Sequence, residues 1–260
     1  MRAYLKKHLP TILCGIASLT AMWVVWIIAQ NTIKNEYVLP SISDTFSAFG
    51  KVLTEGFFWR ALLKTLLKTV YAFLISFVLA GVCSATGKIL SYFGIFLKPI
   101  IAVIRTLPTM AILVLILIYT DKFTAPIIVA SLVLFPMTYA QFNTAFSGID
   151  DGIISATKVF NLTRREKLFK VYLPIIAPPV LSHVGSNLSF AIKLIISAEV
   201  MAYTYTSIGG MMQAANVNYD VARLAALTLV AVFLGLIIEL VFHFIFKFAF
   251  KWNMAEVKND

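Results

Sequence analysis

The chain has 260 residues, of which 60% are hydrophobic and 13% are charged, and its mean hydropathy is +0.88. Soluble domains carry about a quarter of their residues as charged side chains, so this composition excludes an ordinary soluble protein and predicts an integral membrane protein. Its net charge of +10 does not indicate nucleic-acid binding, because the basic residues are spread between apolar runs.

Apolar runs with no or few charges predict six spanning helices, since a charge near the bilayer centre costs about 2.5 to 3.5 kcal/mol on the insertion scale. The first runs from Leu9 to about Ile33 and is expected to be an anchor, because it is too long for a signal peptide and lacks a cleavage site. The other five are expected within residues 69–87, 106–120, 123–149, 177–202 and 221–246. Pro108 predicts a broken or tilted start of the third span, and residues 89–104 are expected to form a short interfacial helix.

Lys and Arg in the connections set the expected orientation. Fourteen of the 22 fall in the segments on the side of the N-terminus and seven, Lys68 among them, on the other side. Both termini are therefore predicted to be cytoplasmic. In the outer loop after the first span, Ser43 or Asp44 is expected to cap a short helix on the membrane surface.

Residues 155–174, SATKVFNLTRREKLFKVYLP, hold five of the 22 basic residues and form the largest predicted cytoplasmic loop. Just upstream, Ser147 is expected to cap a helix with Asp150 in its first turn. An apolar stripe recurs on that helix at helical spacing: Ile149, Ile153, Ala156 and Phe160.

Asn161 is predicted to end this first helix, because Asn tolerates the left-handed conformation common at helix C-termini. Thr163 and Glu166 match a capping box and predict a second helix from Arg164, which Pro174 is expected to end. The alternative is a loop whose cations only set the orientation of the chain in the membrane. Such a loop needs no capped pair of helices, so we also consider that its cations bind lipid headgroups or an acidic partner surface.

The same stretch resembles the EAA loop of the membrane subunits of ATP-binding-cassette importers. Matching positions are Ser155, Ala156 and Thr157 for Glu-Ala-Ala, Asn161 for Gly, and Leu173 and Pro174 for the closing Leu-Pro. Asn in place of Gly is a mild change, whereas Ser155 removes the charge of the motif's Glu. The segments VLPSISDTFSAF, RTLPTMAILVL and SAEVMAYTYTSIGG are similar to the nitrate, sulfonate and taurine branch, and the resemblance covers about residues 36–253.

The resemblance implies a MetI-like permease fold with about six spanning helices in the bacterial inner membrane. It divides the chain into an anchor with an outer helix (1–60), a permease core (61–250, coupling loop about 148–174) and a cytoplasmic tail (251–260). It also implies that the loop, including Arg164 and Arg165, docks on a separate ATPase subunit that binds ATP and Mg. The other implied partners are a second permease copy and an extracytoplasmic solute-binding protein.

Two charges, Lys193 and Glu199, share the fifth predicted span. They are six residues apart and point to different faces of one helix, so each needs its own partner. Our hypothesis is that Lys193 lines the translocation path and attracts an anionic or polar solute, while Glu199 holds a helix contact or gate; His183 is a further candidate for the path. Alternatively, each charge satisfies a neighbouring helix end or the second copy.

An alternative function is an ion- or proton-coupled secondary carrier that uses Lys193 and Glu199 as a relay, although the halves of the chain show no convincing repeat. A membrane enzyme is disfavoured, because the three histidines lack metal-ligand spacing and no nucleophile motif occurs. The chain also lacks a glycine-rich phosphate loop with lysine, so it is not expected to hydrolyse ATP itself. Cys14 and Cys83 lie in apolar runs and are expected to be buried free thiols.

Overall fold

The computed structural model describes residues 2–33, 35 and 38–250, and these residues form helices and their connections. The tail at 251–260 lies outside the described residues. In chain order the helices are α1 (Arg2–Ile33), α2 (Ile42–Thr54), α3 (Gly56–Ile89), α4 (Ser91–Thr106), α5 (Thr109–Tyr119), α6 (Thr124–Ser147), α7 (Asp151–Val159), α8 (Arg164–Glu166), the π-helical η1 (Lys167–Tyr172), α9 (Leu173–Leu181), α10 (Val184–Ala202), α11 (Ile208–Val217) and α12 (Val221–Ala249).

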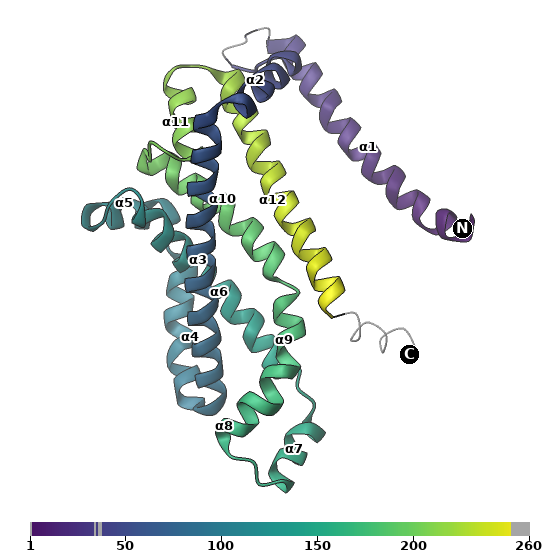
Figure 1. Ribbon diagram of the computed structural model, residues 1–260, viewed down its shortest axis with the longest axis vertical. Coiled ribbons are helices and arrows are strands. Elements are labelled where there is room, and N and C mark those ends of the chain that lie inside the picture. Colours follow the sequence, from purple (N-terminus) through teal and green to yellow (C-terminus); the bar gives the residue numbers. More distant parts are fainter. Residues whose placement is uncertain (1, 34, 36–37, 251–260) are drawn as a thin grey trace.

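The centre of the bundle is formed by α3, α6 and α10, with α12 and α2 packed on the α10 side (Figure 1). Small residues recur every three or four positions along the buried face of α3, including Ala61, Thr65, Ala72, Ser76 and Ala80. Small side chains allow close backbone approach, which drives helix association where lipid removes the usual hydrophobic gain. At one end of the bundle lie α2 and α11, and at the other lie α7 and α8 (Figure 1).

The spans predicted from the sequence are confirmed in number and mostly in position. Five described helices are long and apolar enough to cross a membrane, or six if the bent pair α4 and α5 counts as one span. The five are α1, α3, α6, α10 and α12, and each contains or largely overlaps a predicted run. The predicted fifth span is shorter at its start, because α9 ends at Leu181 and α10 begins at Val184.

The third span differs from the prediction. Its apolar run forms the 11-residue α5, which leaves α4 at 97°, while α4 itself runs alongside α3 and contacts α6 (Figure 1). The expected interfacial position of residues 89–104 is therefore wrong. The bend has a local cause: Leu107, which precedes Pro108, is extended at φ −69° and ψ 129°, as the ring of a following proline requires.

Three smaller expectations are corrected. Lys68, counted among the loop cations, lies fully buried within α3. The cap of α2 is Ser41, two residues before the predicted position, whose hydroxyl accepts a hydrogen bond from the backbone N–H of Asp44 at 2.9 Å. Cys14 and Cys83 are free thiols, but Cys14 is exposed and Cys83 only half-buried in this chain.

Candidate functional site

The first candidate region is the 151–174 hairpin, which comprises α7, α8, η1 and the first two residues of α9 and lies at the end of the molecule opposite α2 (Figure 1). Its first helix is capped differently from the prediction. Ser147 is the last residue of α6, and the Asp150 carboxylate instead accepts a hydrogen bond from the backbone N–H of Gly152 at 2.7 Å. An aspartate at this position also complements the positive end of the helix dipole.

The turn between the two helices confirms the sequence prediction. Asn161 adopts φ 52°, and the backbone N–H of Leu162 donates to the Thr157 carbonyl at 3.2 Å to close the end of α7. Thr163 and Glu166 form both hydrogen bonds of a capping box. A hydrogen bond from Lys170, with those from Thr163, lowers the pKa of Glu166 to about 2.

Pro174 does not end the second helix, contrary to the prediction. The helical path continues from α8 through η1 into α9, where Pro174 occupies the first turn. In η1 the hydrogen bonds skip one extra residue, and the N–H of Leu173 donates to the Leu168 carbonyl. This wider register leads directly into the first turn of α9, where a proline without an N–H is tolerated.

The hairpin has one face fixed to the bundle and one face free. Ile149, Leu168 and Tyr172 pack into a core cluster with Phe142 and Phe146 of α6. The predicted stripe is mostly on the other face: of its four members only Ile149 is buried, and Phe160 is 75% exposed. Val159 and Phe169 are also exposed, and so are these motif residues: Ser155, Ala156, Asn161, Arg164, Arg165, Leu173 and Pro174, whereas Thr157 is buried.

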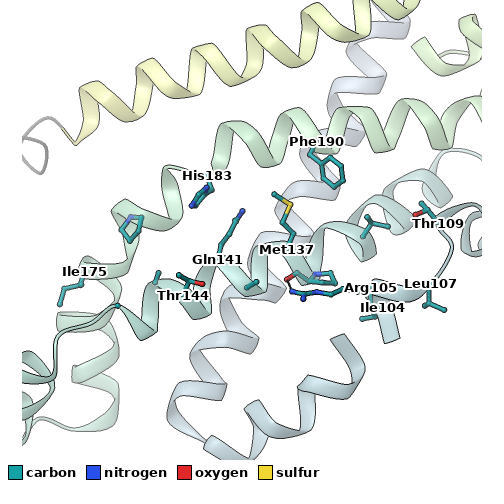
Figure 2. Close-up of a pocket in the computed structure, with 16 residues that line it drawn as sticks. Ile104, Arg105, Leu107, Thr109, Met137, Gln141, Thr144, Ile175, His183 and Phe190 are labelled. Atoms are coloured by element: carbon teal, nitrogen blue, oxygen red, sulfur yellow. Dashed lines mark hydrogen bonds between the residues drawn. The ribbon is translucent and has the colours of Figure 1, made fainter. Parts of the chain in front are cut away.

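The second candidate region is a cavity of about 860 Å³ that lies among the α4–α5 bend, α6, α9 and the start of α10. Figure 2 shows Gln141 of α6 and His183, between α9 and α10, extending into the same space, with Arg105 at the α4 end. Gln141 is held by Asn187 through two reciprocal amide hydrogen bonds of 3.0 and 2.8 Å. One nitrogen of Arg105, Nη2, donates to the Pro136 carbonyl at 3.3 Å.

Of the three predicted path residues, His183 lines this cavity and Lys193 and Glu199 do not. Lys193 is exposed and its aliphatic chain lies beside Gly235 of α12, where its Cε would be 3.8 Å from an added Cβ. Arg105 and Gln141 were not predicted as cavity residues. The one available signal for Arg105 was its position directly before the break at Pro108, since an interrupted membrane helix marks a cavity.

Glu199 instead occupies a buried polar cluster that joins α3, α10 and α11. Its carboxylate contacts Lys68 Nζ at 2.8 Å and accepts hydrogen bonds from the Thr65 hydroxyl at 2.9 Å and the Gly209 N–H at 3.2 Å. Both charged side chains are fully buried. The cluster is a helix contact, in agreement with one of the two roles considered for Glu199, and its partner Lys68 was not foreseen.

The close contact between the start of α11 and α10 requires a glycine, Gly209. A Cβ added there would collide with the Glu199 side chain and lie 2.6 Å from the Ile196 carbonyl oxygen. The next residue, Gly210, approaches the Thr204 carbonyl too closely for any side chain. The glycine pair therefore allows the start of α11 to rest directly on α10.

A family model described as the binding-protein-dependent transport system inner membrane component matches residues 72–251, which is more than half of the chain and includes the hairpin and the cavity. The chain belongs to this family. It is thus a multi-pass inner-membrane protein and a component of a binding-protein-dependent transport system.

Two curated relatives of this permease are weakly similar. It is 25% identical over 170 residues to the glycine betaine/carnitine transport permease protein GbuB of Listeria monocytogenes, covering 64% of this chain and 57% of GbuB. It is 22% identical over 158 residues to the glycine betaine transport system permease protein OpuAB of Bacillus subtilis, covering 60% of this chain and 56% of OpuAB. The match therefore spans less than two thirds of either relative.

Solved structures support the fold of the permease. An inward-facing structure of the MetNI methionine transporter aligns with a TM-score of 0.63 at 18% identity, covering 72% of this chain and 94% of that chain. A bacterial transporter that imports the polysaccharide alginate aligns with a TM-score of 0.65 at 14% identity, covering 95% of this chain and 99% of that chain. The predicted MetI-like fold is confirmed.

Proposed function

We propose that this permease is the membrane subunit of an ATP-binding-cassette importer, which translocates a small solute delivered by an extracytoplasmic binding protein. The family match carries the proposal. In it, a separate ATPase docks on the 151–174 hairpin and supplies the energy, with ATP and Mg bound by that partner. The secondary-carrier alternative loses its basis, because Glu199 is bonded to Lys68 and Lys193 lies away from the cavity.

The free face of the hairpin supports the docking role. Val159 and Phe160 are 78% and 75% exposed at an end of the bundle that also carries exposed Arg164 and Arg165. Exposed apolar side chains beside polar and charged ones are typical of protein interaction sites. A capped turn holds this surface in one shape, which lowers the entropy lost on binding.

The predicted topology completes the proposal. With the hairpin on the cytoplasmic side, both termini face the cytoplasm, and α2 and α11 face the binding protein. A second permease copy, forming a homodimer, would close the cavity along its open side. Two solute classes are candidates: the sequence resemblance favours nitrate, sulfonates or taurine, whereas the two curated relatives are named for glycine betaine and carnitine.

Co-purification tests the docking role. The detergent-solubilised chain is expected to recover an ATPase subunit from its own cells, and Ala156→Arg, which places a bulky cation on the exposed face of α7, is expected to lose it. Ala214→Arg is the matched control, because Ala214 is exposed on α11 at the opposite end. Equal recovery with both variants would refute docking on the hairpin, and absence of any ATPase with the unmodified chain would refute the importer assignment.

A further inference from the structure

The cavity of about 860 Å³ has an unusual charge distribution for a site inside a membrane protein. Among the residues that line it, Arg105 is the single permanently charged side chain, and no carboxylate lines it. The elements around it, α4, α5, α6, α9 and α10, contribute Lys98, Arg105 and Lys193 as cations and Glu199 as their one carboxylate. Because Glu199 is neutralised by its contact with Lys68, the potential in the cavity is positive.

Arg105 is exposed in this chain and lies just before the bend between α4 and α5. Figure 1 shows α4 ending and α5 leaving the bundle partway along α3, well away from the hairpin end of the molecule. Ionisable residues at membrane depth are costly and mark pathways or ligand sites. Within the described residues its guanidinium has one hydrogen-bond partner, the Pro136 carbonyl on Nη2, so Nη1 and Nε keep their donors available.

The remaining polar groups are arranged around the same volume. Gln141 is fixed by Asn187, and Thr109, Thr144 and His183 contribute a hydroxyl, a second hydroxyl and an imidazole. Apolar side chains such as Ile104, Met137 and Phe190 form much of the rest of the wall. A few placed polar groups in a mainly apolar concavity are typical of small-molecule sites.

We propose that this cavity is a solute site on the translocation path that recognises an oxyanion group, a carboxylate or sulfonate, through the free donors of Arg105. A planar guanidinium binds such groups through two parallel hydrogen bonds. The apolar wall then accommodates the rest of a small organic solute. This inference deepens the proposed function and rests on it, and it assigns to Arg105 the anion-attracting role that the sequence analysis gave to Lys193.

Charged thiol reagents test the site without a known solute. Met137→Cys, in a background of Cys14→Ser and Cys83→Ser, places one thiol in the cavity of the purified full chain. The ratio of its reaction rate with anionic 2-sulfonatoethyl methanethiosulfonate to that with cationic 2-(trimethylammonio)ethyl methanethiosulfonate is expected to fall at least about tenfold in Arg105→Gln. Arg105→Lys keeps the charge and is expected to retain most of the ratio.

The controls separate this result from misfolding and from failure of the proposed function. Met201→Cys lies outside the cavity and is exposed, so its ratio should not change with Arg105→Gln. Methanesulfonate should slow labelling of the cavity thiol, and tetramethylammonium should not. An unchanged ratio, or equal protection by both ions, would overturn the proposal. Since the reagents need no ATPase, this outcome is independent of the co-purification result.

A lipid phosphate is the other source of the same chemistry. In maltoside micelles, which contain no phosphate, and in phosphatidylglycerol nanodiscs the reagent ratio of the cavity thiol, divided by that of Met201→Cys in the same environment to remove the surface potential of the anionic lipid, is expected to be the same. Anion preference that appears only in micelles would mean that a lipid headgroup occupies Arg105 in the bilayer, and it would overturn the assignment to a solute.

Discussion

Replacing Glu199 by alanine tests the buried cluster that joins α3, α10 and α11. The change leaves Lys68 fully buried without its partner at 2.8 Å and removes the acceptor for the Thr65 hydroxyl and the Gly209 N–H. Breaking one side of a buried ion pair costs about 3 to 5 kcal/mol, because an uncompensated charge remains. At roughly 2 to 4 °C per kcal/mol for a chain of this size, the melting temperature should fall on the order of 10 °C.

The double variant Lys68→Met with Glu199→Met tests whether the loss of stability comes from the unpaired charge on Lys68. Replacing both members of a buried pair by apolar residues is often neutral, although the Gly209 N–H would still lose its acceptor, at a cost of about 1 to 3 kcal/mol. The double variant is therefore expected to unfold at a higher temperature than Glu199→Ala. Thermal unfolding in nanodiscs, followed by tryptophan fluorescence, measures both. The reasoning would be refuted if the single variant were as stable as the unmodified chain, or if the double variant were the least stable of the three.

Three further predictions follow from local geometry. The hydrogen bond from Lys170 lowers the pKa of Glu166 to about 2 from its ordinary 4.5. The stabilisation of the hairpin by the Glu166 carboxylate is therefore complete above pH 4.5 and is lost as pH falls through about 2. Amide hydrogen exchange of the hairpin, corrected for intrinsic rates, should show unchanged protection between pH 5 and 8; a loss of protection near pH 5 would contradict this pKa. Gly209→Ala should cost about 1 to 3 kcal/mol or more through overpacking, whereas Gly50→Ala, where an added Cβ meets open space, should be neutral or stabilising in α2. Equal melting temperatures for these two variants would show that the packing argument is wrong. Arg223→Ala removes the partly exposed pair with Glu55, at 2.6 Å, and should cost about 1 kcal/mol or less; unfolding midpoints at low and high salt should show the loss shrinking with added salt.

Local signals in the sequence predicted the features that depend on neighbouring residues. The capping box at Thr163 and Glu166 and the left-handed Asn161 were predicted because each depends on side chains within three or four positions. Most spans were predictable for the same reason, since hydropathy is a property of one continuous run.

The predictions that were wrong concern contacts between segments far apart in the sequence, the hydrogen-bond register of a helix, or the choice of a helix cap. Lys68 and Glu199 are 131 residues apart, and nothing in either helix alone identifies the other as its partner. Pro174 would normally indicate a helix end, but a π-helical segment before it changes the hydrogen-bond register. At α2 two serines and an aspartate compete for one cap, and composition alone does not choose among them.

The cavity was the least predictable feature. It is formed by segments from four parts of the chain, and the bend after Arg105 determines which residues reach it. From the sequence, Lys193 and His183 were equally plausible as residues of the translocation path, because each is a polar residue at or near a span. Their separation in space depends on the end of α9, which places His183 at the cavity and rotates Lys193 toward α12.

The continuous helical path from Arg164 to Leu181 has a mechanical consequence. Its 18 residues cover about 25 Å, beginning at the capped turn of the hairpin and ending beside His183, with Ile175 and Pro179 on the cavity wall along the way. The path is not a uniform rod: η1 has a π-helical register, and Pro178 and Pro179 remove two hydrogen bonds inside α9, so these are the points at which the path bends most easily. A displacement of the hairpin would therefore alter the cavity wall at Ile175 and Pro179 by bending α9, while α10 is held by Glu199 at its far end.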